Sequence, residues 1–159
     1  MKKLLAGAIL VAFVAPALAV DKGKAAYMGG TLQLKAKTEL AANTQLPDTV
    51  VLTPKPKEGS PIIIPWTSIE EVEYGQKAGR RVKTAIFLSP LALFGKSRKH
   101  YVTLTWKDAT AVDQTAVLEF DKDDIRQVLA VLKARTGKAI VYQDEEAQKQ
   151  MGGAAAVRK

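Results

Sequence analysis

The pattern that most constrains the fold of this chain is a pair of alternating segments followed directly by one helix. Apolar and polar residues alternate over residues 101–106 and again over residues 115–120, after a polar turn at residues 108–113. Alternation with a period of two is typical of half-buried strands, and a short polar connection makes two such strands antiparallel neighbours. The chain is therefore expected to form a β-hairpin here.

The helix that follows has signals at both ends. Asp121 is expected to cap its N-terminus and Asp124 to lie in its first turn, where carboxylates accept hydrogen bonds from free amides. Phe120 and Ile125 occupy the two positions of a hydrophobic staple, and Gly137 is a typical stop. A helix placed after strands and carrying one apolar stripe should lie across a sheet or fill an opening of a barrel. The stripe consists of Ile125, Val128, Leu129 and Leu132.

Shorter strands are expected elsewhere, although residues 21–28 show no clear periodicity. Ser68 and Glu71 have the spacing of a capping box, which leaves open one helical turn or a further strand; a turn leading into a strand at Val72 fits best. The sequence thus predicts a mainly β fold with one C-terminal α-helix, either an antiparallel bent barrel or a sheet packed by the helix. The additional strands are expected at residues 31–35, 38–42, 49–53, 62–64 and 140–142.

The first nineteen residues have the pattern of a secretory signal peptide. Two lysines precede an apolar run at residues 4–14, and residues 17–19, Ala-Leu-Ala, form a small-residue cleavage site. An uncleaved anchor is the alternative, but the apolar run is shorter than the ~20 residues that span a bilayer. We therefore expect an exported protein, periplasmic or extracellular. Its single domain would cover residues 20–143, followed by a disordered polar, Ala- and Gly-rich tail over residues 144–159.

Few side chains in this sequence are suited to catalysis. The chain has no Cys, which excludes disulfides and a thiol nucleophile, and His100 is its only histidine, which excludes a multi-histidine metal site within the chain. His100 is expected at a strand edge, and the neighbouring Arg98 and Lys99 disfavour its protonated form. The acidic clusters lack the spacing of calcium loops. We therefore predict a protein without catalytic residues, metal or cofactor.

Positive charge is concentrated in the middle of the chain. Residues 74–107 contain no Asp or Glu but carry eight Lys and Arg residues, which lie mainly on either side of an apolar run at residues 84–95. Without residues 1–19 the net charge is +6, so the rest of the chain is slightly acidic and the basicity is local. The predicted anion- or lipid-binding residues are Lys77, Arg80, Arg81, Lys83, Lys96, Arg98 and Lys99.

Two interpretations of the apolar run are open. It is either core, with a buried strand at residues 82–88 and one helical turn that Gly95 ends, or an exposed segment that enters a membrane interface or contacts a partner. With a central proline and only twelve residues, the run is too short to span a bilayer. In the second interpretation the contacting residues are Phe87, Leu91, Leu93 and Phe94.

Several separate blocks of the sequence together resemble a group of small exported bacterial proteins to which no activity is assigned. The resemblance covers most of residues 27–146 and implies no catalytic residues. The blocks lie at residues 27–30, 64–76, 79–82, 99–101 and 134–137.

The order of elements is similar to the pleckstrin-homology and GRAM-like fold, in which antiparallel strands form a bent barrel closed by a C-terminal helix. The similarity rests on the pattern Ile-Pro-x-x-x-Ile-x-x-Val at residues 64–72, followed by strands and a capped helix. Some pleckstrin-homology domains bind anionic lipid headgroups through a basic loop between their first two strands. Here the early connections carry only Lys35 and Lys37. The resemblance therefore implies the fold but not the ligand site.

The predicted function is binding without catalysis. Each basic residue close to an anionic leaflet contributes roughly 1 kcal/mol, so seven suffice for peripheral binding to an anionic lipid or envelope polyanion. Nucleic acid is not expected, because the protein is predicted to be exported and no series of stacking aromatic residues accompanies the basic ones. The alternative is a protein-interaction or scaffold module of the same fold, including self-association through a sheet edge.

Overall fold

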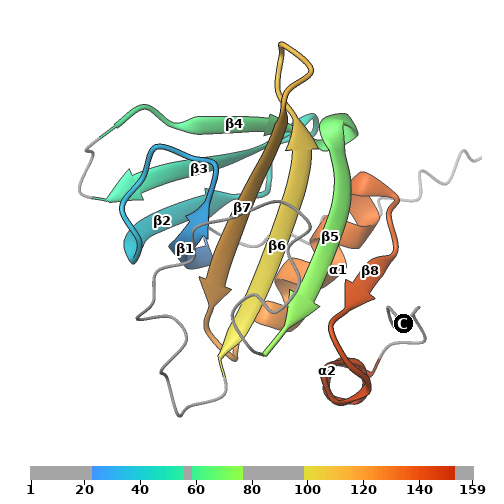
Figure 1. Ribbon diagram of the computed structural model, residues 1–159. Helices are drawn as coiled ribbons and strands as arrows, with labels where there is room; N and C mark the ends of the chain where they lie inside the picture. Colours follow the sequence, from blue (N-terminus) through green and yellow to red (C-terminus); the bar gives the residue numbers. More distant parts are fainter. Residues whose placement is uncertain (1–22, 56–58, 77–98, 153–159) are drawn as a thin grey trace, which may run out of the picture.

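Pairing between strands produces one bent sheet. The computed structural model describes residues 23–55, 59–76 and 99–152. Its eight strands lie in the order β4-β3-β2-β1-β7-β6-β5-β8, and the sheet does not close into a barrel (Figure 1). The elements are β1 (Gly23–Gly30), β2 (Thr38–Asn43), β3 (Thr49–Lys55), β4 (Ile62–Pro65), the 3-10 helix η1 (Trp66–Ser68), β5 (Ile69–Gly75), β6 (His100–Lys107), β7 (Asp113–Phe120), α1 (Ile125–Thr136), β8 (Ile140–Tyr142) and α2 (Glu145–Met151).

Strand β1 joins the two halves of the sheet. It pairs antiparallel with β2 on one side and with β7 on the other. Figure 1 shows β2, β3 and β4 running across the direction of β5, β6 and β7. The register with β7 shifts between Tyr27 and Gly29, and such a bulge increases the bend and twist of a strand. One strand can therefore serve both halves although their directions differ.

Helix α1 packs against the inner face of the bent sheet. The inner side chains of β6 and β7 belong to the same apolar cluster as the buried stripe of α1. β4 and β5 do not pair with each other but are connected by η1, which α1 contacts. No helix in the described ranges is long and apolar enough to cross a membrane. The predicted fold class, a mainly β chain whose sheet is packed by a helix, is confirmed.

The best-marked elements of the sequence form as predicted. The hairpin is β6 and β7, whose register pairs Val102 with Leu118 and Leu104 with Ala116. The predicted apolar stripe of α1 is buried, and Val131 extends it. The turn before Val72 is η1, and β5 follows it. The remaining correct strand predictions, at residues 38–42, 49–53, 62–64 and 140–142, correspond to β2, β3, β4 and β8.

The first strand is where the prediction is wrong. The sequence predicts a strand at residues 31–35 and none before it, whereas β1 spans Gly23–Gly30 and the following residues turn back toward β2. Lys24 is exposed, but further along β1 Tyr27 belongs to the main core and Met28 to a cluster on the opposite face. Where successive residues are buried on both faces, apolar and polar residues do not alternate, so the period-two signal is missing in this part of the strand.

The start of α1 also differs from the prediction. The helix begins at Ile125 after Asp124, whose side chain makes no capping hydrogen bond. The carbonyl oxygen of Asp121 accepts hydrogen bonds from the amides of Asp124 and Ile125, so a main-chain turn takes the place of the predicted Asp121 cap. The end agrees with the prediction, since Gly137 adopts the left-handed conformation with φ of 66°.

A second helix, α2, lies where the sequence predicts disorder. A side-chain oxygen of Asp144 accepts a hydrogen bond from the amide of Ala147 at 2.8 Å, and Ala147 is buried. The guanidinium of Arg126 in α1 donates to the carbonyl oxygen of Gln150 at 3.0 Å. This cap and these tertiary contacts stabilise a helix that its polar composition does not predict. The prediction of disorder is therefore wrong for residues 145–151.

The face of the sheet opposite α1 is buried as well. Met28, Tyr101 and Val117 form a second apolar cluster on it. Beside them Glu73 and Thr103, which are direct partners on β5 and β6, are each only 7% exposed. Part of each of the strands β1, β7, β6 and β5 is therefore buried on both faces, whereas Lys24, Asp113, Lys107 and Glu70 near their ends are exposed.

Two short strands form the edges of the sheet. β4 has four residues, Pro61 precedes it and Pro65 ends it, and Ile63 is 62% exposed. β8 has three residues and pairs with β5 in parallel. Proline cannot donate a main-chain hydrogen bond to a neighbouring strand. Both edges thus offer few groups for further pairing.

We predict that Gly30→Ala destabilises the protein strongly. Gly30 has φ of 138°, and an added Cβ would lie 2.1 Å from the carbonyl oxygen of Thr115, a main-chain atom of β7. We expect a loss of about 3 kcal/mol or more in the free energy of unfolding, measured by urea denaturation. Gly152→Ala is the matched control, because Gly152 has φ of 67° with nothing within 4 Å. It should lose only about 1 kcal/mol, and equal losses would contradict the prediction.

Candidate functional site

Most of the predicted binding residues lie outside the described part of the chain. Lys99 is the one member of the predicted set that the structure describes, and it is exposed. Whether the others come together therefore stays a prediction. The predicted residues outside the described ranges are Lys77, Arg80, Arg81, Lys83, Lys96, Arg98, Phe87, Leu91, Leu93 and Phe94.

The described strands do fix where this segment begins and ends. β5 ends at Gly75 and β6 begins at His100, and Gly75 is the direct partner of Tyr101 across the antiparallel pair. Gln76 and Lys99 therefore extend from adjacent strands at the same end of the sheet. The two basic clusters, one following Gln76 and the other preceding Lys99, are attached at one point of the molecule.

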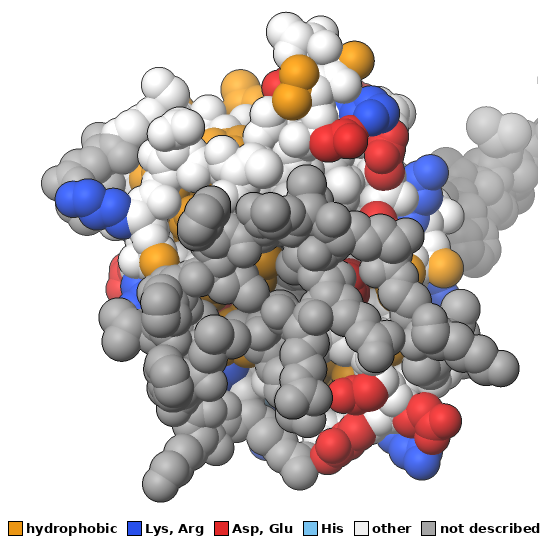
Figure 2. Space-filling view, in the orientation of Figure 1, with side chains coloured by type: hydrophobic (Ala, Val, Ile, Leu, Met, Phe, Trp, Pro, Cys, Tyr) orange, Lys and Arg blue, Asp and Glu red, His pale blue; other side chains and the backbone are white. Residues whose placement is uncertain are grey.

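The positive charge of the chain does not reside in the described elements. The described residues include 12 Lys and Arg against 14 Asp and Glu, a net charge of −2. Residues 77–98 carry six Lys and Arg and no acidic residue. In the view of Figure 2, acidic side chains (red) and basic side chains (blue) of the described residues accordingly lie side by side and do not form one basic face. The segment 77–98 is thus a local source of positive charge on a slightly acidic body.

Lys99 itself is less suited to binding an anion than the sequence predicts. Its ammonium forms an ion pair with Glu119, and the two side chains are 44% and 18% exposed. Glu119 is also the cross-strand partner of Tyr101, and burial together with this carboxylate raises the pKa of Tyr101 to about 12. A ligand anion would therefore have to compete with a carboxylate that the sheet holds in place. For the other six basic residues of the set, anion binding stays a prediction.

His100 is a buried structural residue. It points to the inner face at the start of β6, where the Tyr74 hydroxyl lies 2.7 Å from its Nδ1 and the two rings stack with centroids 6.0 Å apart. Burial lowers the pKa of His100, and the charge of Lys122 lowers it further. The direction agrees with the prediction from Arg98 and Lys99, but the main cause is burial. The neutral ring is suited to pairing with Tyr74 rather than to exchanging protons with solvent.

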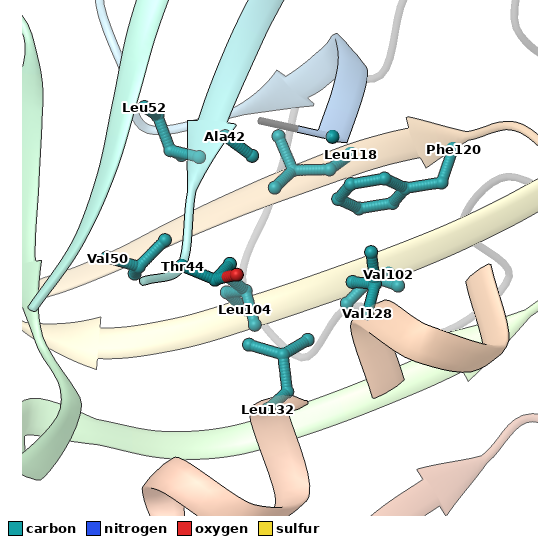
Figure 3. A pocket seen from close by; sticks show the side chains of 11 residues that line it. Ala42, Thr44, Val50, Leu52, Val102, Leu104, Leu118, Phe120, Val128 and Leu132 are labelled. Carbon is teal, nitrogen blue, oxygen red and sulfur yellow. The ribbon is translucent and has the colours of Figure 1, made fainter. Parts of the chain in front are cut away.

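The inner core contains a small apolar cavity between the sheet and α1. It offers about 20 Å³, which is close to the minimum that holds one water molecule. Figure 3 shows the Thr44 hydroxyl turned toward the side chains of Leu104 and Leu132 in this cavity. The Thr44 oxygen is buried and has no hydrogen-bond partner among the described residues. A water there would lack the two or more polar partners it needs, so the cavity is a packing defect rather than a ligand site.

The described residues were also compared with the geometry of a metal site. Within the described ranges, no group of three or more His, Cys, Asp or Glu side chains is placed to hold a metal ion. The chain matches no protein-family model, and no curated protein matches it. The resemblances to small exported bacterial proteins and to the pleckstrin-homology and GRAM-like fold therefore stay predictions from the sequence.

We predict that Thr44→Val stabilises the protein. The substitution replaces a buried hydroxyl without a partner by a methyl group of similar size, and it removes a desolvation penalty. We expect a gain of about 1 kcal/mol in the free energy of unfolding by urea denaturation. Thr44→Ser is the control, because it keeps the hydroxyl and loses the methyl, and it should lose about 1 kcal/mol. A loss of stability in Thr44→Val would show that the hydroxyl has a partner.

We also predict a stability decrease at mildly acidic pH that depends on His100. Because burial lowers its folded-state pKa, the unfolded chain binds the proton more readily. Stability from the neutral ring is fully present above about pH 6.5, the ordinary pKa of histidine, and is lost as the pH falls toward the folded-state pKa. The free energy of unfolding should therefore fall more between pH 7.5 and 5.5 in the natural protein than in His100→Gln. Equal decreases would rule out this role.

Proposed function

We propose that this protein is an exported, non-catalytic binding module that docks on an anionic membrane or envelope surface through a basic-flanked apolar segment, residues 77–100. The observation that carries the proposal is the anchoring of this segment between the paired ends of β5 and β6. The basic residues that follow Gln76 and those that precede Lys99 start from the same end of the sheet, so their fields add there.

Magnitudes support the proposal. Residues 77–98 carry six cations without an acidic residue, and each cation near an anionic leaflet contributes roughly 1 kcal/mol. Both ends of the segment are held by the sheet, which reduces the conformational entropy that binding has to remove. The apolar residues Phe87, Leu91, Leu93 and Phe94 would add contact with the membrane interface.

Vesicle co-sedimentation tests the proposal. The natural protein should pellet with vesicles that contain phosphatidylglycerol and not with pure phosphatidylcholine, and raising the ionic strength from about 0.05 to about 0.5 M should release it. The variant R80Q/R81Q/K96Q/R98Q should bind at least about 100-fold more weakly, because four contributions of roughly 1 kcal/mol are lost. Lys99 is left unchanged because of its ion pair with Glu119.

A matched control separates a local site from the overall charge. The variant K35Q/K37Q/R135Q/K138Q removes the same number of charges from exposed positions of the described surface. It should lose much less affinity than the first variant. All three proteins share residues 1–22, so any membrane binding by that part is equal among them. Equal pelleting of the two variants, or pelleting that is insensitive to salt, would overturn the proposal.

A further inference from the structure

A solvent-open groove lies between α1, β8 and α2. Figure 1 shows these three elements near one another at the β8 edge of the sheet. It offers about 220 Å³, roughly ten times the space of the inner cavity. Its floor is apolar, with Leu129 from α1, Ile140 and Tyr142 from β8 and Met151 from α2. A groove of this kind can bury part of an apolar chain from solvent.

The rim of the groove is positively charged. Arg126 and Lys133 both line it and both are exposed. They stand seven residues apart on α1, which places them on the same side of the helix about 10 Å apart along its axis. None of the described residues that line the groove is acidic. Apolar floor and basic rim together match a molecule that has an apolar chain and an anionic head.

We propose that this groove binds one anionic amphiphile, with its single apolar chain along the floor and its carboxylate or phosphate head at Arg126. A guanidinium presents a planar set of donors that matches both kinds of oxyanion. One terminal nitrogen of Arg126 donates to the carbonyl oxygen of Gln150 at 3.0 Å, which holds the guanidinium against the C-terminal part of α2. The guanidinium is therefore oriented before the ligand arrives.

The groove lies close to the attachment point of the basic segment. The side-chain amide of Gln76, the last described residue of that connection, donates to the side-chain oxygen of Gln150. Gln150 thus contacts both Gln76 and Arg126. The proposal rests on the proposed function for the encounter with an anionic surface, and it names the ligand class taken up next to that surface. The groove itself is built only from described residues.

Two other hollows of the described residues fit such a ligand less well. A hollow of about 190 Å³ beside β1, β2 and β7 is lined by Lys24 and Lys55 but also by Glu39, Glu119 and Asp121. Three carboxylates against two ammonium groups disfavour an anion. The inner cavity at Thr44 is too small for an alkyl chain. Of these three hollows, the α1–β8–α2 groove combines space, an apolar floor and one sign of charge.

Isothermal titration calorimetry with three amphiphiles below their critical micelle concentrations tests the ligand class. Dodecanoate and dodecyl phosphate share the chain of dodecyltrimethylammonium but differ in the sign of the head. Each anionic amphiphile is expected to bind with a stoichiometry of one, and the cationic one at least about tenfold more weakly. A preference between the two anions would distinguish a free fatty acid from a phosphate-bearing lipid as the source. Equal binding of all three would overturn the proposal.

Two pairs of variants test the location. Ala130 is exposed on α1 and lines the groove, whereas Ala134 is exposed on α1 outside it. Ala130→Trp should fill the groove and weaken dodecanoate binding at least about tenfold, while Ala134→Trp leaves it unchanged. Arg126→Gln should also weaken binding about tenfold, and Arg135→Gln, outside the groove, should not. Circular dichroism establishes that all four variants are folded.

The same variants separate this proposal from the proposed function. Ala130→Trp should still pellet with vesicles that contain phosphatidylglycerol, because the basic segment is intact. The variant R80Q/R81Q/K96Q/R98Q should lose vesicle binding but keep the affinity for dodecanoate within about threefold. Binding of dodecanoate to Ala130→Trp with the affinity of the natural protein would overturn the groove and leave surface docking in place.

Discussion

The pairing of β1 with both β2 and β7 is the constraint on which the rest of the structure depends. Without it the chain would consist of two separate groups of strands that run in different directions. The bulge between Tyr27 and Gly29 allows one strand to belong to both groups. Next to the bulge, Gly30 packs closely against the main-chain carbonyl of Thr115 in β7. The apolar stripe of α1 packs against the concave face produced in this way, and the two form one core.

Local signals predict the parts of this fold that are made of contiguous residues. The β6–β7 hairpin and α1 each carry their period and their ends within twenty residues or so, and the structure contains both. β1 was not predicted because Tyr27 and Met28 are buried on opposite faces, so this part of its sequence lacks the alternation that reveals a half-exposed strand. α2 was hidden because its stability comes from contact with Arg126 and burial of Ala147, and neither can be recognised in a polar segment alone.

The candidate site divides in the same way. A charge pattern predicts the basic segment, and only strand pairing reveals that its two ends are attached side by side. The sequence predicts the direction of the His100 pKa shift but from the wrong neighbours, because adjacent residues of a strand point to opposite faces and Lys99 lies away from the ring. The sequence around Arg126 and Lys133 contains no pattern that predicts a groove. In the sequence they are ordinary solvated positions of α1, and the floor beneath them forms only when β8 and α2 return to that helix.

The two outer strands of the sheet have a consequence for the association of copies of this chain. An open sheet exposes main-chain donors and acceptors on which further copies can stack into fibrils. Here one rim is interrupted by Pro61 and Pro65, and the other is three residues long beside α2. These short edges disfavour pairing with further copies of the chain, so the sheet can stay open without closing into a barrel.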